Sequence, residues 1–320
     1  MDIPQELKEA IDRISTQTNS TKIIEESQKI SKRYRENEGK GKKLVTQNSE
    51  AIAYAISGMP ATYSAVYSAL STALKNSNEK IETVLDVGAG TGAATWAVSN
   101  LTNSNQITCL EREKEMINIG RDLMKDCELL SNTSWKEFDA LNDNIEQKYD
   151  LVMTSYMINE LPEGTRKDVI NKLWDATNKI LLIIEPGTPE GFKHILQARE
   201  MLLEKGANIL APCTHQNECA IKDDWCSFYV RVARSGIHRQ AKKGELGYED
   251  EKFSYVAFSK SDVRVCNSRI LRHPQINKGY VKVKLCTENG IEEKTFSKKD
   301  GELYKRIKKL DAGDSIENMD

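Results

Sequence analysis

The sequence contains no long hydrophobic run and no recognisable targeting segment. Its longest stretch of aliphatic side chains is residues 180–184, far short of the ~20 apolar residues that a membrane-spanning helix needs. The first residues, MDIPQELKEAIDRI, are acidic and have neither an apolar core nor an Arg-rich composition. We therefore exclude a membrane protein, and we expect no signal or transit peptide and a cytoplasmic location.

Repeats and low-complexity tracts are also absent from the 320 residues, of which 39% are hydrophobic and 29% charged. This composition is typical of a soluble globular protein, and the chain is long enough to bury a core without disulfide bonds. Seven cysteines in a chain with no export signal argue against disulfide partners. They indicate buried thiols, metal ligands or redox chemistry.

The net charge of −2 conceals a division along the chain. Residues 1–192 carry 22 Lys and Arg against 29 Asp and Glu, residues 193–309 carry 24 against 15, and residues 310–320 carry four acids and no base. An acidic front half and a basic back half indicate that a polyanion, such as nucleic acid, contacts the back half. The alternative is a surface of solvated lysines.

Apolar spacing predicts a helical N-terminal region, with helices over 5–35 and about 48–75, a break at 39–43 and an interruption at Pro60. Strand and helix patterns then alternate, which is typical of a doubly wound parallel sheet. The predicted strands are 83–87, 106–110, 149–154 and 179–185, and the predicted helices are 92–101, 114–126 and 165–177.

The regular alternation of strand and helix patterns ends at about residue 190. A predicted helix over 193–206 leads into a Cys-containing loop region over 211–247, and further strands are predicted at 253–258, 280–286 and 291–296, the last two joined into a hairpin by Asn289-Gly290. We therefore divide the chain into a helical region (1–78), an α/β core (79–192), a Cys-containing, β-rich basic part that completes the fold (193–310) and an acidic tail (311–320).

A glycine-rich turn follows the first predicted strand. In Asp86-Val87-Gly88-Ala89-Gly90-Thr91-Gly92 the alternate glycines let backbone amides approach a ligand at the start of a helix. Dinucleotide-binding turns have the related spacing G-x-G-x-x-G, and alanine stands here at its last position. The carboxylate of Asp86 would repel a pyrophosphate, but it can accept a hydrogen bond through water from the ammonium group of S-adenosylmethionine (SAM).

The string resembles the first motif of the class I (Rossmann-like) SAM-dependent methyltransferases. The resemblance implies that α/β fold, here with an N-terminal helical region and a C-terminal Cys-containing, β-rich basic extension. Glu111 ends the second strand, where a carboxylate would hold a ribose diol. The candidate cofactor residues are Asp86, Gly88, Ala89, Gly90, Thr91, Gly92, Glu111, Asp139 and Ala140, the last two because they follow an aromatic segment of the kind that approaches adenine in such methyltransferases.

The end of the fourth strand carries no familiar catalytic motif. It has neither the Asn/Asp-Pro-Pro-aromatic string of amino-group methyltransferases nor the Pro-Cys pair of C5-pyrimidine enzymes. Tyr156, Asn159 and Glu160 are candidates for positioning a substrate, and packing and capping are their alternative roles. No general base is evident, so activity is left open.

Three cysteines and one histidine fall within fourteen residues: Cys213, His215, Cys219 and Cys226. Thiolates this close in a reducing compartment indicate zinc or an iron–sulfur cluster, and the spacings of five and six are looser than those of zinc ribbons. The fourth ligand would come from Cys266, Cys286 or His215. Unrelated buried thiols are the alternative, and Cys109 and Cys127 are expected to be structural.

The whole chain resembles the methyltransferase-like proteins associated with the mitochondrial small ribosomal subunit and their prokaryotic relatives. The specific strings are Glu185-Pro186-Gly187-Thr188-Pro189 and Ala211-Pro212-Cys213-Thr214-His215. The resemblance implies a role in assembly of the small ribosomal subunit through contact with its ribosomal RNA (rRNA). It also implies a four-iron four-sulfur cluster on Cys213, Cys219, Cys226 and Cys286 that clamps the basic part onto the core.

The mitochondrial members carry a transit peptide, and no such segment is expected here. We therefore expect a prokaryotic relative. Residues 260–309 hold 14 Lys and Arg against 6 acids, so they are expected to contact phosphates. The candidate RNA-binding residues are Arg231, Arg234, Arg239, Lys242, Lys243, Arg264, Arg269, Arg272, Lys282 and Lys284. The first hypothesis is a SAM-binding assembly factor. The alternatives are an active SAM-dependent methyltransferase of rRNA or ribosomal protein and, third, a small-molecule methyltransferase with structural zinc.

Overall fold

The computed structural model describes residues 1–36, 41–242, 244–263 and 265–316 of the chain. Four helices precede the first strand: α1 (Gln5–Ser15), α2 (Ser20–Glu36), α3 (Asn48–Ser57) and α4 (Met59–Lys75). The predicted helix over 5–35 is therefore two helices, because Asn19 Oδ1 accepts a hydrogen bond from the backbone N–H of Lys22 (2.7 Å) and starts α2. Pro60 lies in the first turn of α4, where the missing N–H removes no helical hydrogen bond.

The predicted alternation of strands and helices is confirmed. The first five strands are parallel to one another: β1 (Thr83–Val87), β2 (Gln106–Glu111), β3 (Thr133–Glu137), β4 (Tyr149–Ser155) and β5 (Thr177–Pro186). The helices among and after them are α5 (Ala93–Ser99), α6 (Lys114–Met124), α7 (Arg166–Asp175) and α8 (Pro189–Glu204).

The main sheet is completed by the part of the chain that the sequence placed in the basic extension. The elements there are β6 (Asn208–Ala211), β7 (Phe228–Ala233), α9 (Gly236–Ala241) and β8 (Tyr248–Ser259). Among the described residues the strand order is β3-β2-β1-β4-β5-β8-β6, with β8 antiparallel to its neighbours and β7 paired to its first half. This order, with one antiparallel strand inserted near the edge, is that of the class I SAM-dependent methyltransferases, so the expected fold is confirmed.

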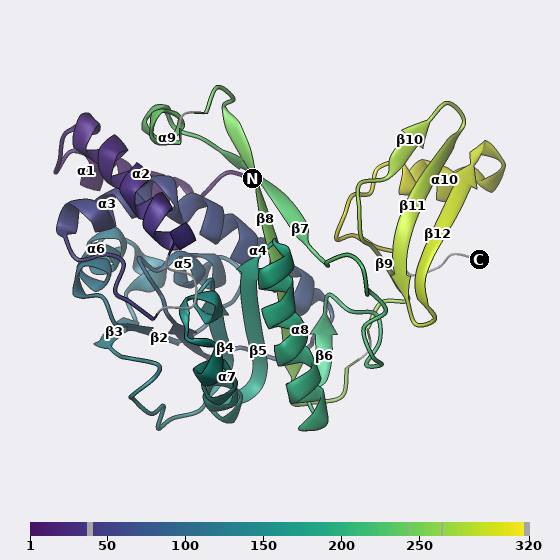
Figure 1. Cartoon of the computed structure of the whole chain (residues 1–320), viewed down its shortest axis with the longest axis horizontal. Coiled ribbons are helices and arrows are strands. Elements are labelled where there is room, and N and C mark those ends of the chain that lie inside the picture. Colours follow the sequence, from purple (N-terminus) through teal and green to yellow (C-terminus); the bar gives the residue numbers. More distant parts are fainter. Residues whose placement is uncertain (37–40, 243, 264, 317–320) are drawn as a thin grey trace.

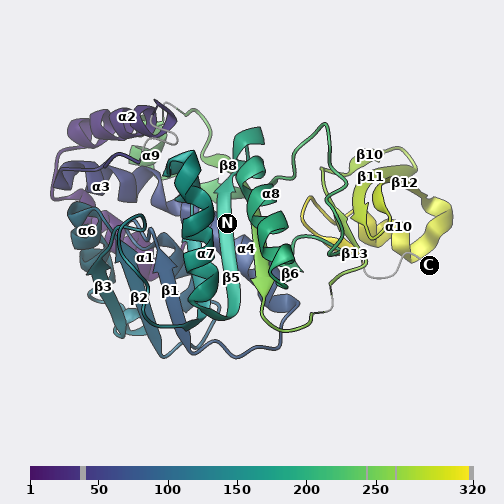
Figure 2. The ribbon, with the colours of Figure 1, turned by 60° about the horizontal axis from the view of Figure 1, so that its bottom comes forward.

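The two faces of the main sheet are covered by different helices (Figures 1 and 2). Neighbouring residues of β1 point to opposite faces: Val84 belongs to the core that includes α1–α6, and Leu85 belongs to the core that includes α7 and α8. The N-terminal helices thus share one core with the sheet. None of the helices in the described ranges is both long and apolar enough to span a bilayer.

A second sheet follows the main one and lies at one end of the molecule (Figure 1). Its elements are β9 (Ser268–Ile270), β10 (Gln275–Asn277), β11 (Tyr280–Thr287), β12 (Gly290–Ser297), α10 (Gly301–Ile307) and β13 (Ser315–Ile316). The predicted hairpin is confirmed, with Thr287 paired to Gly290 across the turn. A small core of its own, including Ile270, Leu285 and Ile307, holds this sheet together.

Candidate functional site

The turn after β1 requires glycine at alternate positions. Gly88, Gly90 and Gly92 have φ angles of 72°, 57° and 87°, which side chains other than glycine rarely tolerate. A Cβ atom on Gly88 would lie 2.9 Å from Cγ of Met157. The turn therefore lies directly against the segment that follows β4, and its backbone lines a cavity between the ends of β1, β2 and β4.

We call this space the first cavity. It is bordered by the ends of the central strands, by the tyrosines of α2 and α3, and by the segment after β4. Of the predicted cofactor residues, Gly88, Gly90, Glu111, Asp139 and Ala140 line it. The others lie behind or beside its wall: Asp86, Ala89, Thr91 and Gly92.

Asp86 is completely buried beneath the glycine turn. Its Oδ2 accepts a hydrogen bond from the hydroxyl of Thr95 (2.8 Å), and its Oδ1 has no partner among the described residues. Burial raises the pKa of Asp86 to about 7. An unpartnered buried acceptor beside the cavity fits the predicted water-mediated contact with an ammonium group.

Glu111, at the end of β2, is held on three sides by backbone N–H groups. Gly90 donates to its Oε2 (2.8 Å), and Arg112 and Glu113 donate to its Oε1 (2.8 and 2.9 Å). Each carboxylate oxygen can accept two hydrogen bonds, so Oε2 of Glu111 retains capacity for one hydroxyl of a ribose. Asp139 uses both carboxylate oxygens in its own turn, accepting from Leu141 N and Asn142 Nδ2.

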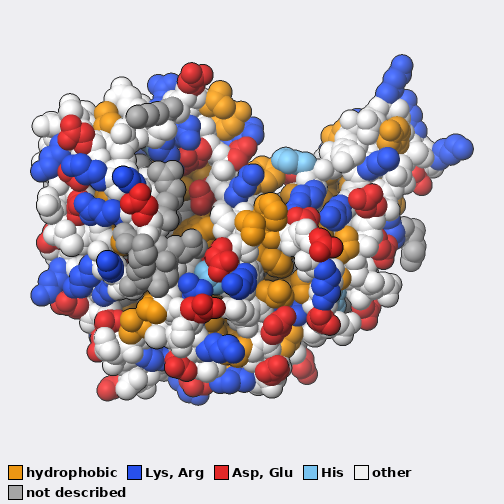
Figure 3. All heavy atoms as spheres, viewed as in Figure 1, with side chains coloured by type: hydrophobic (Ala, Val, Ile, Leu, Met, Phe, Trp, Pro, Cys, Tyr) orange, Lys and Arg blue, Asp and Glu red, His pale blue; other side chains and the backbone are white. Residues whose placement is uncertain are grey.

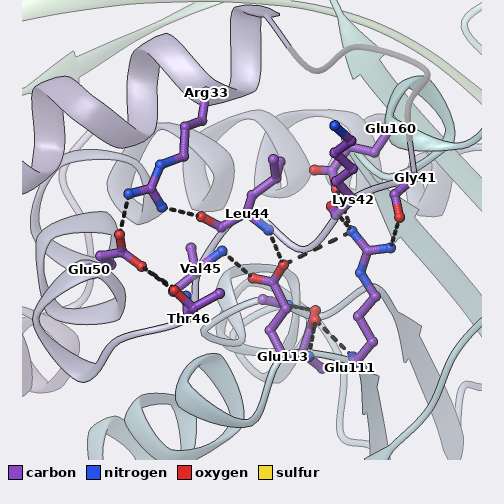
Figure 4. A network of polar contacts seen from close by, with 12 residues as sticks. Arg33, Gly41, Lys42, Leu44, Val45, Thr46, Glu50, Glu111, Glu113 and Glu160 are labelled. Carbon is purple, nitrogen blue, oxygen red and sulfur yellow. Dashed lines mark hydrogen bonds and ion pairs between the residues drawn. The ribbon is translucent and has the colours of Figure 1, made fainter.

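A segment between α2 and α3, residues 41–47, is fastened beside the cavity by the two residues after Glu111 (Figure 4). We call it the strap. Glu113 accepts hydrogen bonds from the backbone N–H groups of Leu44 (2.5 Å) and Val45 (3.0 Å), and Arg112 donates to the carbonyl oxygens of Gly41 (2.9 Å) and Lys42. The sequence identified Glu111 but missed both neighbours, although their adjacency to it was the available signal.

Carboxyl groups outnumber cationic groups around the first cavity. Glu111, Glu113 and Glu160 line it, whereas Arg112 is the one cation among its described lining residues. Burial and the neighbouring carboxylates raise the pKa of Glu113 to about 7 and that of Glu160 well above its usual value. A cavity of this kind favours a cationic ligand, and SAM carries both a sulfonium and an ammonium group.

The predicted substrate-positioning residues lie on the segment after β4. Tyr156 has a left-handed backbone (φ 59°), and its hydroxyl donates to Oε1 of Glu251 on β8 (2.8 Å). Tyr156 and Glu160 line the first cavity, whereas Asn159 lines a second cavity on the far side of Tyr156. Tyr54 on α3 lines both cavities and was missed, because nothing in its local sequence distinguishes it from a packing residue.

The four predicted cluster cysteines line one apolar cavity: Cys213, Cys219, Cys226 and Cys286. They come from the segment between β6 and β7 and from β11, so the cavity joins the main sheet to the second sheet. Cys266 is not among its lining residues; it is buried and accepts a hydrogen bond from Arg269. All seven cysteines are free, and Cys109 and Cys127 are buried in the core.

Sulfur donors and arginine side chains line this cavity together. Burial raises the pKa of all four thiols, while the guanidinium of Arg199 lowers that of Cys213 and would compensate bound thiolates. Cys286 Sγ lies 3.9 Å from His215 Nε2. In the part of the chain that the structure describes, however, no three Cys, His, Asp or Glu side chains stand close enough together to hold a metal ion.

Only some of the predicted RNA-binding residues lie on the surface. Arg269 is 3% exposed, and its guanidinium donates to the carbonyl oxygens of Pro212 and Gly313 (2.6 Å to the latter). Its assignment to a phosphate-binding surface is wrong, because the side chain is used to hold β9 against the cysteine segment. Arg272 and Lys284 form ion pairs with Asp224 (2.8 and 3.2 Å).

Most of the described predicted RNA-binding residues between 231 and 242 are paired with acidic side chains of β8. Arg231 is paired with Asp250 (2.8 Å), and Arg234 and Lys242 are both paired with Glu249 (2.8 and 2.7 Å). Arg239 is exposed on α9 and Lys282 on β11. Lys243 and Arg264 lie outside the described residues. On the face in Figure 3, lysines and arginines alternate with acids instead of forming one continuous patch.

The fold and the cavity at the strand ends define the class: an α/β protein of the methyltransferase-like kind. Within that class the chain belongs to the Rsm22 family, described as "Mitochondrial small ribosomal subunit Rsm22", which matches residues 48–317. The match runs through the glycine turn, the cysteine segment and the whole of the second sheet. The expected family resemblance is thereby confirmed.

Two relatives illustrate the similarity. The chain is 24% identical over 197 residues to "Ribosome assembly protein METTL17, mitochondrial" of Homo sapiens, a match over 56% of this chain and 42% of that protein. It is 25% identical over 251 residues to "Rsm22-cox11 tandem protein 2, mitochondrial" of Schizosaccharomyces pombe, a match over 70% of this chain and 33% of that protein. The matched region thus spans less than half the length of either relative.

Among solved structures, the chain is similar to magnesium protoporphyrin IX methyltransferase from Synechocystis PCC 6803 with bound SAM. The TM-score is 0.44 and the sequence identity 13%, over 76% of this chain and 98% of that one. A SAM-dependent methyltransferase from Aquifex aeolicus gives a TM-score of 0.43 and 14% identity, over 68% of this chain and 100% of that one.

Proposed function

We propose that this protein acts in assembly of the small ribosomal subunit by contacting its rRNA, that it binds SAM in the first cavity, and that Cys213, Cys219, Cys226 and Cys286 hold a four-iron four-sulfur cluster. The single observation that carries the proposal is the continuous Rsm22 family match over residues 48–317. It spans both the glycine turn and the cysteine cavity, so one family pattern includes both candidate cofactor sites.

The SAM assignment is supported by the charge and hydrogen-bonding capacity of the first cavity. Glu111 can accept from one ribose hydroxyl, and Asp86 offers an unpartnered buried oxygen toward an ammonium group through water. Bound SAM would contribute an electrophilic methyl group. The chain itself contributes a buried, anionic enclosure in which a cation loses little by leaving water.

The cluster assignment is supported by the origin of its four sulfurs. Three come from the segment between β6 and β7 and one comes from β11, so a bound cluster would cross-link the main sheet to the second sheet. Arg199 and Arg269 beside the sulfurs would balance the charge of an anionic thiolate cluster. Zinc on the same ligands is the alternative occupant.

The RNA assignment depends on the second sheet being held in place. Lys282 is exposed on β11, on the same strand as Cys286. Loss of the cluster should therefore weaken RNA binding through the position of this strand, even where no lysine is changed. Because contacts to phosphates release counterions, the affinity should fall steeply with salt.

The decisive experiment is co-sedimentation of the protein with small ribosomal subunits from cells lacking this gene, together with labelled SAM. Binding to immature subunits in preference to mature ones, with or without label transfer, supports the assembly function. No binding to either, at low and at physiological salt, would contradict it.

A second candidate function, methyl transfer to rRNA or a ribosomal protein, is favoured by one observation. Tyr156, with its left-handed backbone, and Glu160 follow β4 and both line the first cavity, and desolvation raises the pKa of Glu160, which makes its carboxylate a stronger proton acceptor. Label recovered in RNA or in one protein in the same experiment would establish it. The third candidate, a small-molecule methyltransferase with zinc, requires stoichiometric zinc and no iron in anaerobically purified protein.

A further inference from the structure

The second cavity is separated from the first by tyrosines. Tyr34, Tyr54 and Tyr156 line both spaces, and the second is the roomier, about 350 Å³ against about 80 Å³. Its remaining polar walls include Asn159 and Glu251. It lies between the N-terminal helices, the segment after β4 and β8, so it exists only because the helical region covers this end of the sheet.

The wall between the two cavities is held in a fixed and strained conformation. A left-handed backbone is unfavourable for a tyrosine and persists only where the surroundings impose it. Two contacts impose it here. Glu251 accepts the hydroxyl hydrogen bond of Tyr156, and the buried carboxylate of Glu185 accepts from the backbone N–H of Ile158 (3.1 Å).

The side chain of Glu185 is itself held in place by a buried histidine. Its Oε2 lies 3.2 Å from Nδ1 of the buried His194, whose Nε2 contacts Arg166. Glu185 opens the Glu-Pro-Gly-Thr-Pro string, and Pro186 and Thr188 of that string line the second cavity. This string therefore builds the second cavity and not the first.

Hydrogen-bond acceptors in the second cavity lack cationic partners. Of the charged groups that the structure describes, none forms an ion pair with Glu251; Lys242 at the rim is paired with Glu249 instead, at 2.7 Å. The Oδ1 atom of Asn159 has no hydrogen-bond partner among the described residues. Burial raises the pKa of Glu251, while the hydrogen bond from Tyr156 and the charge of Lys242, which also lines the cavity, lower it.

Aromatic faces combined with a carboxylate that has no ion-pair partner among the described residues are the chemistry that recognises a substituted ammonium ion. We propose that the second cavity binds an alkylammonium group of a protein partner, presented as a lysine side chain. Glu251 would pair with the cation, Asn159 would accept one of its hydrogen bonds, and the tyrosines would pack against its methylene stem. This assignment needs no ligand in the first cavity, so it can stand or fall independently of SAM binding.

The test uses the full chain with ¹³C-labelled tyrosine rings, titrated with Nα-acetyl-lysine amide and observed by NMR. The neutral probe Nα-acetyl-norleucine amide has a similar stem and no charge. We expect the lysine probe to shift tyrosine signals with at least about tenfold higher affinity than the norleucine probe. Equal affinities, or shifts produced by cytidine or adenosine but not by the lysine probe, would overturn the proposal.

Glu251→Gln keeps an acceptor for Tyr156 but removes the charge, and it should weaken lysine binding about tenfold. Glu302→Gln on the exposed surface of α10 is the matched control and should leave binding unchanged. If Glu251→Gln does not fold, Asn159→Leu removes the unpartnered oxygen and should also weaken binding. Unchanged affinity in a folded variant of either kind contradicts the assignment, whereas lysine binding by a protein that fails to bind SAM contradicts only the SAM proposal.

Discussion

The carboxylate of Glu113 accepts a hydrogen bond from the backbone N–H of Val45, which lies 3.0 Å away and 68 residues earlier in the chain. The adjacent Leu44 donates to the other oxygen of the same carboxylate. Through these bonds the strap is fastened to the start of α6, two residues beyond the carboxylate that is proposed to hold the ribose of SAM (Figure 4). Hydrogen bonds therefore link the N-terminal helical region directly to the residues around the first cavity.

Glu113→Gln should loosen the strap. The amide replaces one accepting oxygen by a donor, so one of the two backbone N–H groups loses its partner, at a cost of about 1–3 kcal/mol in the free energy of unfolding. Limited proteolysis between α2 and α3 should become faster. Glu115→Gln on the same helix is the control and should change stability by less than about 0.5 kcal/mol. Wild-type stability and protease resistance in Glu113→Gln would show that the strap is held elsewhere.

Stability without ligand should decrease as the pH rises from about 4.5 to about 7. Asp86 and Glu113 have folded-state pKa values raised to about 7, so the folded state binds more protons than the unfolded state in this interval. Their stabilising contribution is complete below the unfolded pKa and is lost as the pH passes the folded pKa. Urea unfolding at pH 5.0, 6.0 and 7.5 measures the slope, and Asp86→Asn should flatten it.

SAM affinity should change with pH in the opposite direction. Because ionised Asp86 and Glu113 attract a cation and their protonated forms do not, the dissociation constant should fall as the pH rises from about 6 to 8. The neutral product S-adenosylhomocysteine should show a weaker dependence, since it lacks the sulfonium charge. Calorimetric titrations at three pH values measure both. Identical pH profiles for the two ligands would indicate that the charge of the cavity does not govern binding.

Gly88→Ala should abolish SAM binding and destabilise the fold. The φ angle of 72° and the predicted 2.9 Å contact with Met157 Cγ both oppose a Cβ atom, and together they should cost about 1–3 kcal/mol. Gly164→Ala introduces a Cβ where no atom lies within 4 Å. That control should be neutral for binding. Full SAM affinity in a folded Gly88→Ala variant would separate the turn from the ligand site.

The cysteine cavity and the basic second sheet can be separated by three substitutions. Cys213→Ser should reduce iron content, stability and RNA binding together, whereas Cys266→Ser outside the cavity should retain iron. Lys282→Ala should lower RNA affinity without loss of stability, because the side chain is exposed. Iron and sulfide analysis measures the iron content, thermal unfolding measures the stability, and RNA titration at two salt concentrations measures the RNA affinity. Full iron content in Cys213→Ser would contradict the ligand set.

The local pattern of the sequence was sufficient for much of the fold. The alternation of β-branched strands with helical spacing predicted β1, β2, β4 and β5 and their helices, because periodicity is a property of neighbouring residues. The Asn289-Gly290 turn predicted its hairpin for the same reason. The pattern did not separate α1 from α2, and it missed β7 and α9 inside a region that was expected to be loop.

The sequence likewise predicted some residues of the candidate site and missed others. The glycine turn and Glu111 were visible because a strand end and its turn are adjacent in sequence. Tyr54, Glu113 and Glu251 were not identified, since their roles depend on contacts with residues far away in the chain. The burial of Arg269 was equally invisible, and a basic composition alone could not distinguish a phosphate-binding arginine from one that holds β9 to the cysteine segment.

The sequence by itself determined the alternation of strands and helices in the parallel core, the turn that only glycine can form and the presence of three cysteines within fourteen residues. The tertiary structure alone decided which carboxylates lack a cation, which basic residues face solvent and that two cavities meet at one strained tyrosine. The physical reason is that backbone conformation is set mainly by near neighbours, whereas burial and charge compensation are set by whatever the fold brings alongside.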